Sequence, residues 1–332
     1  GEVILWSIDD TQGYQLLARV RVSNAAIFSI AFRPTDKAAY SPNGETWLAT
    51  GGQDGAVRLI KLDPDAQAQA VLREPSTSWV WQVSFSRDGK RLAATRQLET
   101  PEVWALDFDS PLSPVPSQLM KPMTGTQVFI GHAFSPDGTW LATGDINNSL
   151  GFWRVESTVP TATRIFTENL GSFFVWSVAW SDDGQTLATG IGNGRVQVFD
   201  VDYAANGVPR GLKNRRLLRG HAERDRNDAA YKVAFYPKDP NVLFSAAWDG
   251  SVGMWEIVSQ NVVAQHPRAA LALAYSPTGD LVSAGRENTI FLDDGFLFSG
   301  SGKTFAFCGL NSMASPTFFV ALRAAMASMA RL

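Results

Sequence analysis

Apolar and polar residues alternate along most of this 332-residue chain, in short stretches separated by turn residues. Val83 and Phe85 alternate with polar or small neighbours, and Val196 and Val198 do the same farther along. A period of two is typical of strands with one buried face. Asp-Gly and Asn-Gly pairs between the stretches indicate tight hairpin turns. No long segment inside the repeated part has helical spacing, so the pattern predicts an all-β protein.

The stretches recur in a fixed order: an apolar strand, a turn, Leu-Ala-Thr-Gly or a close variant, and a further strand. The clearest copy spans residues 133–144. Successive anchor residues are 53, 49, 46, 55 and 40 positions apart, and units of about 40–45 residues are typical of four-stranded propeller blades. The longer intervals predict loop insertions. The six anchor aromatics are Phe32, Phe85, Phe134, Trp180, Phe235 and Tyr275.

The repeat resembles that of the WD40 family over roughly residues 1–293, and the run from Trp79 to Gly89 is similar to the regular arrays of bacterial multidomain signalling proteins. The resemblance implies a β-propeller. It also implies a hydrogen-bonded tetrad, which one copy matches in full. Five other copies depart from it; for example, Leu98 stands at the Asp position of the second. Apolar packing between sheets can hold a propeller without complete tetrads. The matched tetrad residues are His221, Ser245, Asp249 and Trp255.

The two ends of the chain decide the expected number of blades. Residues 2–9 and 15–22 resemble the outer two strands of a blade, and closure of a ring requires inner partners for them. Residues 304–308 and 317–322 are the candidates, and residues 295–298 are expected to form the outer strand of the sixth blade.

We therefore expect one seven-bladed propeller over residues 1–323, closed by the N-terminal strands, and a C-terminal tail over residues 324–332. The alternative is six blades followed by a helical tail, with Ser315 as N-cap and Pro316 in the first turn. The chain opens at Gly1, already inside a strand and without methionine. We expect it to be a piece of a longer protein.

Charge and cysteine content restrict the possible functions. A net charge of −3 gives no whole-molecule attraction to nucleic acid or to an anionic membrane. The single cysteine, Cys308, excludes an intramolecular disulfide and a cysteine-based zinc site. It is compatible with the cytoplasm, where we expect the protein. No run of 18 or more apolar residues suggests a membrane span.

The candidate catalytic motifs have structural explanations. The run from Ser299 to Thr304 lacks the first glycine of a phosphate-binding loop, because Leu297 stands there. The histidines lie in different repeats without metal spacing, and the paired aspartates fall at turn positions. We therefore expect no enzyme activity, cofactor or small-molecule substrate.

Large aromatic residues recur at the start of the first strand of several repeats, mostly four residues before the anchor. In WD40 proteins this end of the strand lies at the rim of the top face, so the aromatics are candidates for contacting a partner. The alternative is packing between blades. The candidate rim residues at these strand starts are Phe28, Trp79, Trp81, Phe174, Trp176 and Tyr231, and Trp248, which stands before the turn aspartate Asp249, is added to them.

A basic insertion between Asp202 and Asp228 is a second candidate surface, because clustered cations can contact phosphate or an acidic partner. The alternative is a solvated loop with an exposed outer strand. Its candidate residues are Arg210, Lys213, Arg215, Arg216 and Arg219.

Taken together, the sequence predicts a non-catalytic module that binds a protein or peptide and serves as a scaffold or sensor arm of a larger signalling protein. Two alternatives remain: a propeller enzyme with a site in its central channel, and a nucleic-acid-binding protein that uses the basic loop. The residue pattern favours neither of them.

Overall fold

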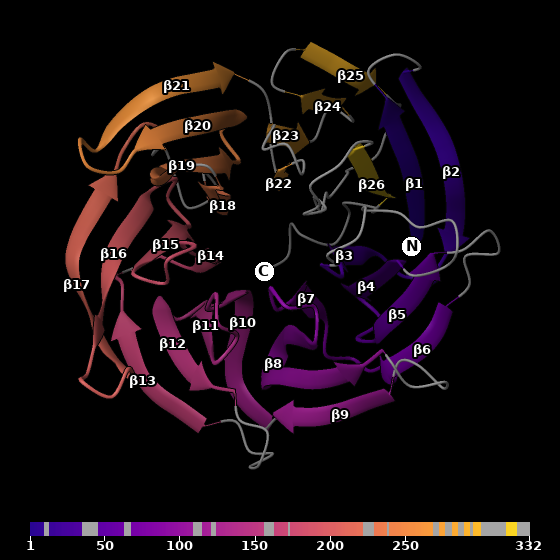
Figure 1. Ribbon diagram of the computed structural model, residues 1–332, viewed down its shortest axis with the longest axis horizontal. Helices are drawn as coiled ribbons and strands as arrows, with labels where there is room; N and C mark the ends of the chain where they lie inside the picture. Colours follow the sequence, from indigo (N-terminus) through magenta and orange to yellow (C-terminus); the bar gives the residue numbers. More distant parts are fainter. Residues whose placement is uncertain are drawn as a thin grey trace.

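The computed structural model describes fifteen segments of the chain, and all regular elements within them are strands. The prediction of an all-β protein is confirmed. Figure 1 shows the sheets arranged around a common axis, with one strand of each nearest the centre. The described residues are 1–9, 13–34, 46–62, 68–108, 115–120, 124–155, 163–171, 173–221, 229–237, 239–267, 272–275, 281–284, 289–292, 295–299 and 317–323.

Four sheets each contain four antiparallel strands in sequence order, from the innermost to the outermost (Figure 1). Each sheet is named below by its innermost strand. The β3 sheet consists of β3 (Ile27–Phe32), β4 (Thr46–Gly52), β5 (Val57–Leu62) and β6 (Ala68–Arg73). The β14 sheet consists of β14 (Val175–Trp180), β15 (Thr186–Ile191), β16 (Val196–Tyr203) and β17 (Pro209–Leu218). The β18 sheet consists of β18 (Ala230–Tyr236), β19 (Asp239–Ala247), β20 (Ser251–Glu256) and β21 (Asn261–Pro267). The β22 sheet consists of β22 (Ala272–Tyr275), β23 (Leu281–Ala284), β24 (Thr289–Leu292) and β25 (Gly295–Ser299).

The second and third repeats are joined into one sheet. The long strand β8 replaces two strands of the second repeat and passes through Leu98, whose φ is +60°. The start of β10 then pairs with β8, with Thr124 opposite Glu99 and Val128 opposite Gln97. This sheet consists of β7 (Val80–Phe85), β8 (Arg91–Asp107), β9 (Val115–Met120), β10 (Thr124–Phe134), β11 (Trp140–Asp145), β12 (Ser149–Arg154) and β13 (Thr163–Asn169).

Strands from the two ends of the chain meet in a three-stranded sheet. It has the order β2 (Gly13–Arg21), β1 (Glu2–Asp9) and β26 (Thr317–Arg323), with Ile4 opposite Ala321. The helical alternative is wrong for residues 317–323, because they form a strand whose backbone pairs with β1. The expected strand at residues 304–308 and the tail at 324–332 lie outside the described residues.

The recurring phrase encodes the hairpin between the first two strands of a repeat. After β10, the Ser135 hydroxyl donates to Asp137 at 2.5 Å and accepts the amide of Trp140 at 3.0 Å. Gly138 takes a φ of +71°, which favours glycine. The same serine–aspartate contact closes the turns at Ser86 and Ser181.

The glycine that ends Leu-Ala-Thr-Gly allows the next sheet to approach closely. A Cβ on Gly144 would lie 2.4 Å from the Val175 side chain, and one on Gly190 would lie 2.2 Å from the Ala230 carbonyl oxygen. Both positions face the innermost strand of the following sheet, so a side chain there would push neighbouring sheets apart.

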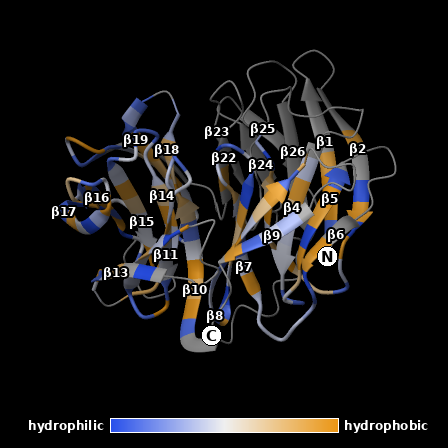
Figure 2. Cartoon of the chain, turned by 60° about the horizontal axis from the view of Figure 1, so that its bottom comes forward, coloured by the Kyte–Doolittle hydropathy of each residue, from blue (hydrophilic) through white to orange (hydrophobic). Residues whose placement is uncertain are grey.

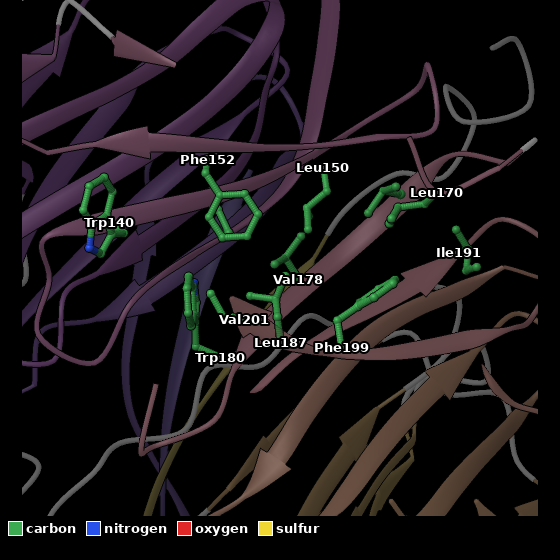
Figure 3. Packing of buried hydrophobic residues seen from close by; sticks show 12 residues of the cluster. Trp140, Leu150, Phe152, Leu170, Val178, Trp180, Leu187, Ile191, Phe199 and Val201 are labelled. Atoms are coloured by element: carbon green, nitrogen blue, oxygen red, sulfur yellow. The ribbon is translucent and has the colours of Figure 1, made fainter. Parts of the chain in front are cut away.

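Apolar side chains fill the space between neighbouring sheets, and Figure 2 shows hydrophobic residues spread along strands such as β10. Figure 3 shows the contact between the third repeat, which contains β12, and the β14 sheet. The ring centroids of Phe152 and Trp180 are 5.8 Å apart there. Phe152 also stacks on Phe166 at 4.2 Å. Each large side chain buried in this way contributes roughly 1.5–3 kcal/mol, so packing between sheets holds the arrangement together.

Candidate partner-binding surface

The innermost strands begin on one face of the molecule, which we call the entry face. In five repeats, an amide shortly after the threonine or serine of the second strand donates to a carbonyl on the first strand or directly before it; Gln97 lies within β8 and Val128 within β10. This bond places the aromatic residues at the strand starts and the following turns on the same face. The bonds are Gln53 N to Ala26 O at 2.8 Å, Gln97 N to Trp79 O at 3.0 Å, Ile146 N to Val128 O at 3.1 Å, Gly192 N to Phe174 O at 2.9 Å, and Trp248 N to Ala229 O at 2.9 Å.

Four aromatic rings form a continuous row on the entry face across the β14 and β18 sheets. The ring centroids of Phe174 and Trp176 are 6.1 Å apart, those of Trp176 and Tyr231 are 4.7 Å apart, and those of Tyr231 and Trp248 are 5.3 Å apart. Phe174 is 39% exposed and the other three are half-buried. We call these four residues the aromatic row.

The other three candidate rim residues form a second cluster on the β3 and β7 strands. Phe28 stacks on Trp81 at 5.4 Å, and Trp79 lies 5.6 Å from Trp81. Trp81 is only 7% exposed, because it packs against Val128 and Ile130 of β10. Trp176 of the aromatic row packs against the same cluster, so the two groups are in contact, and the structure buries Trp81 between repeats.

The tetrad residues of the β18 sheet contact one another. Ser245 Oγ lies 2.6 Å from His221 Nε2 and accepts the indole N–H of Trp255 at 2.7 Å. Asp249 Oδ2 lies 3.3 Å from His221 Nδ1. Ser251, which sequence reasoning missed, connects the two by a 2.8 Å contact with His221 and a 2.7 Å hydrogen bond to Asp249. The network fixes the turn that carries Trp248.

The comparisons with known proteins agree with this geometry. A family model described as "WD domain, G-beta repeat" matches residues 123–154, 161–200 and 212–256. The chain contains WD40 repeats. The resemblance to this family is thereby confirmed.

Three relatives show the range of similarity. WD repeat-containing protein VIP3 of Arabidopsis thaliana is 34% identical over 35% of this chain and 35% of its own length. Actin-interacting protein 1 of Caenorhabditis elegans is 25% identical over 52% of this chain and 28% of its own length. Protein groucho of Drosophila melanogaster is 26% identical over 46% of this chain and 19% of its own length. The chain spans about a third or less of the curated relatives it matches.

In other repeats of the chain, different residues make contacts at the positions of the tetrad. In the first repeat, Ser23 donates to Asp54 at 2.7 Å, and Arg58 pairs with the same carboxylate at 2.7 Å. Burial alone would raise the pKa of Asp54, but the hydrogen bonds from Arg58 and Ser23 lower it below its ordinary value. In the third repeat, Trp153 donates to Thr143 at 2.8 Å.

A buried charged cluster occupies the tetrad region of the second repeat, and sequence reasoning missed it. Arg96 and Glu102 are both fully buried, with Arg96 Nε 3.8 Å from Glu102 Oε2. Arg73 pairs with Glu102 at 3.4 Å and with Glu99 at 3.4 Å. Burial raises the pKa of Glu102. One sequence signal was available, because Arg96 stands where three other repeats have glycine after threonine.

The basic insertion is largely a strand, not a loop. Pro209–Leu218 form β17, the outermost strand of the β14 sheet. Asp202 pairs with Arg210 at 2.6 Å and with Lys213 at 3.2 Å, and Asp200 pairs with Arg216 at 2.5 Å. Three of the five candidate cations are thus neutralised by neighbours on β16, while Arg215 and Arg219 are exposed.

Metal-ligand groups and membrane-spanning helices are both absent from the part of the chain that the structure describes. Within the described ranges, no three histidine, cysteine, aspartate or glutamate side chains are grouped as metal ligands would be. The same part of the chain has no helix long and apolar enough to cross a membrane.

Proposed function

We propose that this chain is a non-catalytic protein- or peptide-binding module and that its partner docks on the aromatic row. The observation that carries the proposal is the row itself, which crosses two sheets and ends in the exposed ring of Phe174. Tryptophan and tyrosine dominate the binding energy of protein interfaces, because they bury a large apolar area and lose little entropy.

The relatives support a role in protein assembly, since one of them is named for its interaction with actin. We also propose that the chain acts in the cytoplasm as a scaffold or sensor arm of a larger signalling protein. Its partner is a protein or peptide and not a nucleic acid or a membrane. The pairing of Arg210, Lys213 and Arg216 with aspartates leaves less basic charge for phosphate contacts.

The proposal includes a seven-bladed propeller over residues 1–323, with 324–332 as a tail. In four repeats, the second strand contacts the innermost strand of the next repeat. The contacting pairs are β4 with β7, β11 with β14, β15 with β18, and β19 with β22. Strand β26 contacts β3 in the same way. This supports β26 as the second strand of a last blade, with β1 and β2 as its third and fourth strands.

Selection of peptides from a random display library on the immobilised chain, followed by affinity measurements with one selected peptide, tests the binding surface. Replacing Phe174 or Trp248 with alanine is expected to weaken binding by about tenfold or more each, since hot-spot truncations cost over about 1.4 kcal/mol. The matched control is Val258→Ala, which removes a side chain that is 72% exposed in the turn after β20. Equal affinity of all three variants for the peptide would contradict the proposed surface.

A further inference from the structure

One recurring contact lies next to the candidate rim residues. Among the described strands, the innermost strands β3, β7, β14 and β18 each pair with one strand of their own sheet, which leaves their other edge facing a neighbouring repeat. The residue directly after the rim position reaches across to the innermost strand of the next repeat. Its side chain forms a hydrogen bond with the backbone of that strand. The backbone partner is the residue two positions after the rim residue of the next repeat.

Three described repeats make this contact. Ser29, after Phe28, accepts the amide of Val83 at 3.0 Å. Gln82, after Trp81, donates to the carbonyl of His132 at 2.9 Å and accepts its amide at 3.0 Å. Ser177, after Trp176, accepts the amide of Val233 at 3.1 Å. The contact therefore follows the repeat, although the side chain that makes it changes.

The third repeat differs in a consistent manner. Its rim residue is the buried Ile130, and the following residue is Gly131, which has no side chain. A Cβ at Gly131 would lie 2.6 Å from the carbonyl oxygen of Trp176. Here the neighbouring strands touch directly, whereas the repeats of Phe28, Trp81 and Trp176 carry a polar side chain between the strands.

From these contacts we infer that Ser177 is a positioning residue for the aromatic row. Its hydroxyl joins β14 to β18 one residue after Trp176 and two residues after Tyr231. Ser177 is 1% exposed and Val233 is 1% exposed, so water does not replace this bond. The bond fixes the distance between the two strands and with it the 4.7 Å spacing of the two rings. This inference rests on the proposed function, because the spacing matters to a partner that docks on the row.

The test uses the indole N–H resonances of the full chain, with the Trp176 signal assigned through Trp176→Phe. Ser177→Ala is expected to move the Trp176 resonance and to lower affinity for the library-selected peptide about fivefold, which corresponds to about 1 kcal/mol. Ser29→Ala is the matched control. It breaks the same bond between β3 and β7, and it is expected to move the Trp79 and Trp81 signals farther than that of Trp176, which packs against the edge of the same cluster.

An unchanged Trp176 resonance in folded Ser177→Ala would overturn the inference, whatever the peptide does. If Ser177→Ala does not fold, Ser177→Cys provides the same measurement, because it keeps the size of the side chain and weakens the hydrogen bond. A moved resonance with unchanged peptide affinity would also overturn the link to binding. In that case the Phe174→Ala and Trp248→Ala variants still decide the proposed function independently.

Discussion

The imidazole of His132 lies 2.7 Å from the hydroxyl of Ser84 and so joins two neighbouring repeats. Its other nitrogen lies 3.0 Å from the hydroxyl of Thr95. Three other repeats have valine at the position of His132, namely Val83, Val178 and Val233. Complete burial, together with the charge of Lys232, lowers the pKa of His132 to about 3. The histidine is therefore neutral in the folded protein at ordinary pH.

His132 makes stability depend on pH in a defined window. Below pH 6.5, the ordinary pKa of histidine, His132 is protonated in the unfolded chain but stays neutral in the folded chain. The contribution of neutral His132 to the free energy of unfolding is therefore complete above pH 6.5 and falls as the pH drops toward 3. His132→Val is expected to be destabilised at pH 7, and its deficit relative to the native chain narrows by up to about 1.4 kcal/mol per pH unit below 6.5. Urea unfolding of both proteins between pH 4 and 8 measures this. A pH-independent difference would show that the burial of His132 does not govern it.

The serine of the complete tetrad bonds two buried side chains, whereas its counterpart in the third repeat bonds one side chain and a backbone carbonyl. Ser245→Ala removes the partner of both His221 and Trp255, and each buried polar group left unpaired costs about 1–3 kcal/mol. Thr143→Val removes the acceptor of one buried side chain, Trp153, and a long 3.5 Å bond to the Gly151 carbonyl. We expect Ser245→Ala to lower the free energy of unfolding more than Thr143→Val does. Chemical denaturation compares the two, and the reverse order would contradict the role of the network.

The buried pair of Arg96 and Glu102 allows a prediction with opposite outcomes for single and double variants. Glu102→Ala leaves the buried guanidinium of Arg96 without its nearest fully buried partner and is expected to cost about 3 kcal/mol. The double replacement Arg96→Met with Glu102→Leu removes both charges and is expected to recover most of that loss. Thermal unfolding distinguishes the two cases. A double variant that is less stable than Glu102→Ala would show that the charges themselves stabilise the repeat.

The small residue at position 131 is required by the approach of two strands. Gly131→Ala places a Cβ within 2.6 Å of the Trp176 carbonyl oxygen and is expected to destabilise the chain by about 1–3 kcal/mol. Gly211→Ala is a matched control, because a Cβ there meets nothing within 4 Å. Melting temperatures of both variants check this, and equal values would contradict the close approach.

Much of the fold could be predicted because its determinants are local. The alternation of apolar residues marks the strands, and the Ser-x-Asp-Gly turn carries its own hydrogen bonds, as Ser135 and Asp137 show. A strand at 317–322 was also expected, because closure of a ring requires inner partners for the N-terminal strands. The continuous course of β8 was not, because it depends on the left-handed conformation of Leu98 and on pairing with β10.

The candidate surface was less accessible to sequence reasoning, because exposure depends on neighbours from other repeats. Trp81 and Trp176 occupy the same position in the repeat and pack against the same cluster, but Trp81 is buried there whereas Trp176 is half-buried. Similarly, the charges of β17 look available in the sequence, while in the structure Arg210 and Arg216 meet aspartates on β16. These ion pairs form because the register of β17 against β16 brings the side chains together.

The pairing of β1 with β26 has a consequence for synthesis. Strand β1 is made long before its partner, since the residue opposite Ile4 is Ala321. One edge of the β2–β1 hairpin therefore stays without this strand partner until the residues between β2 and β26 have been synthesised. An open edge is a template for pairing with other chains, so the period before β26 arrives is when this protein is most exposed to aggregation.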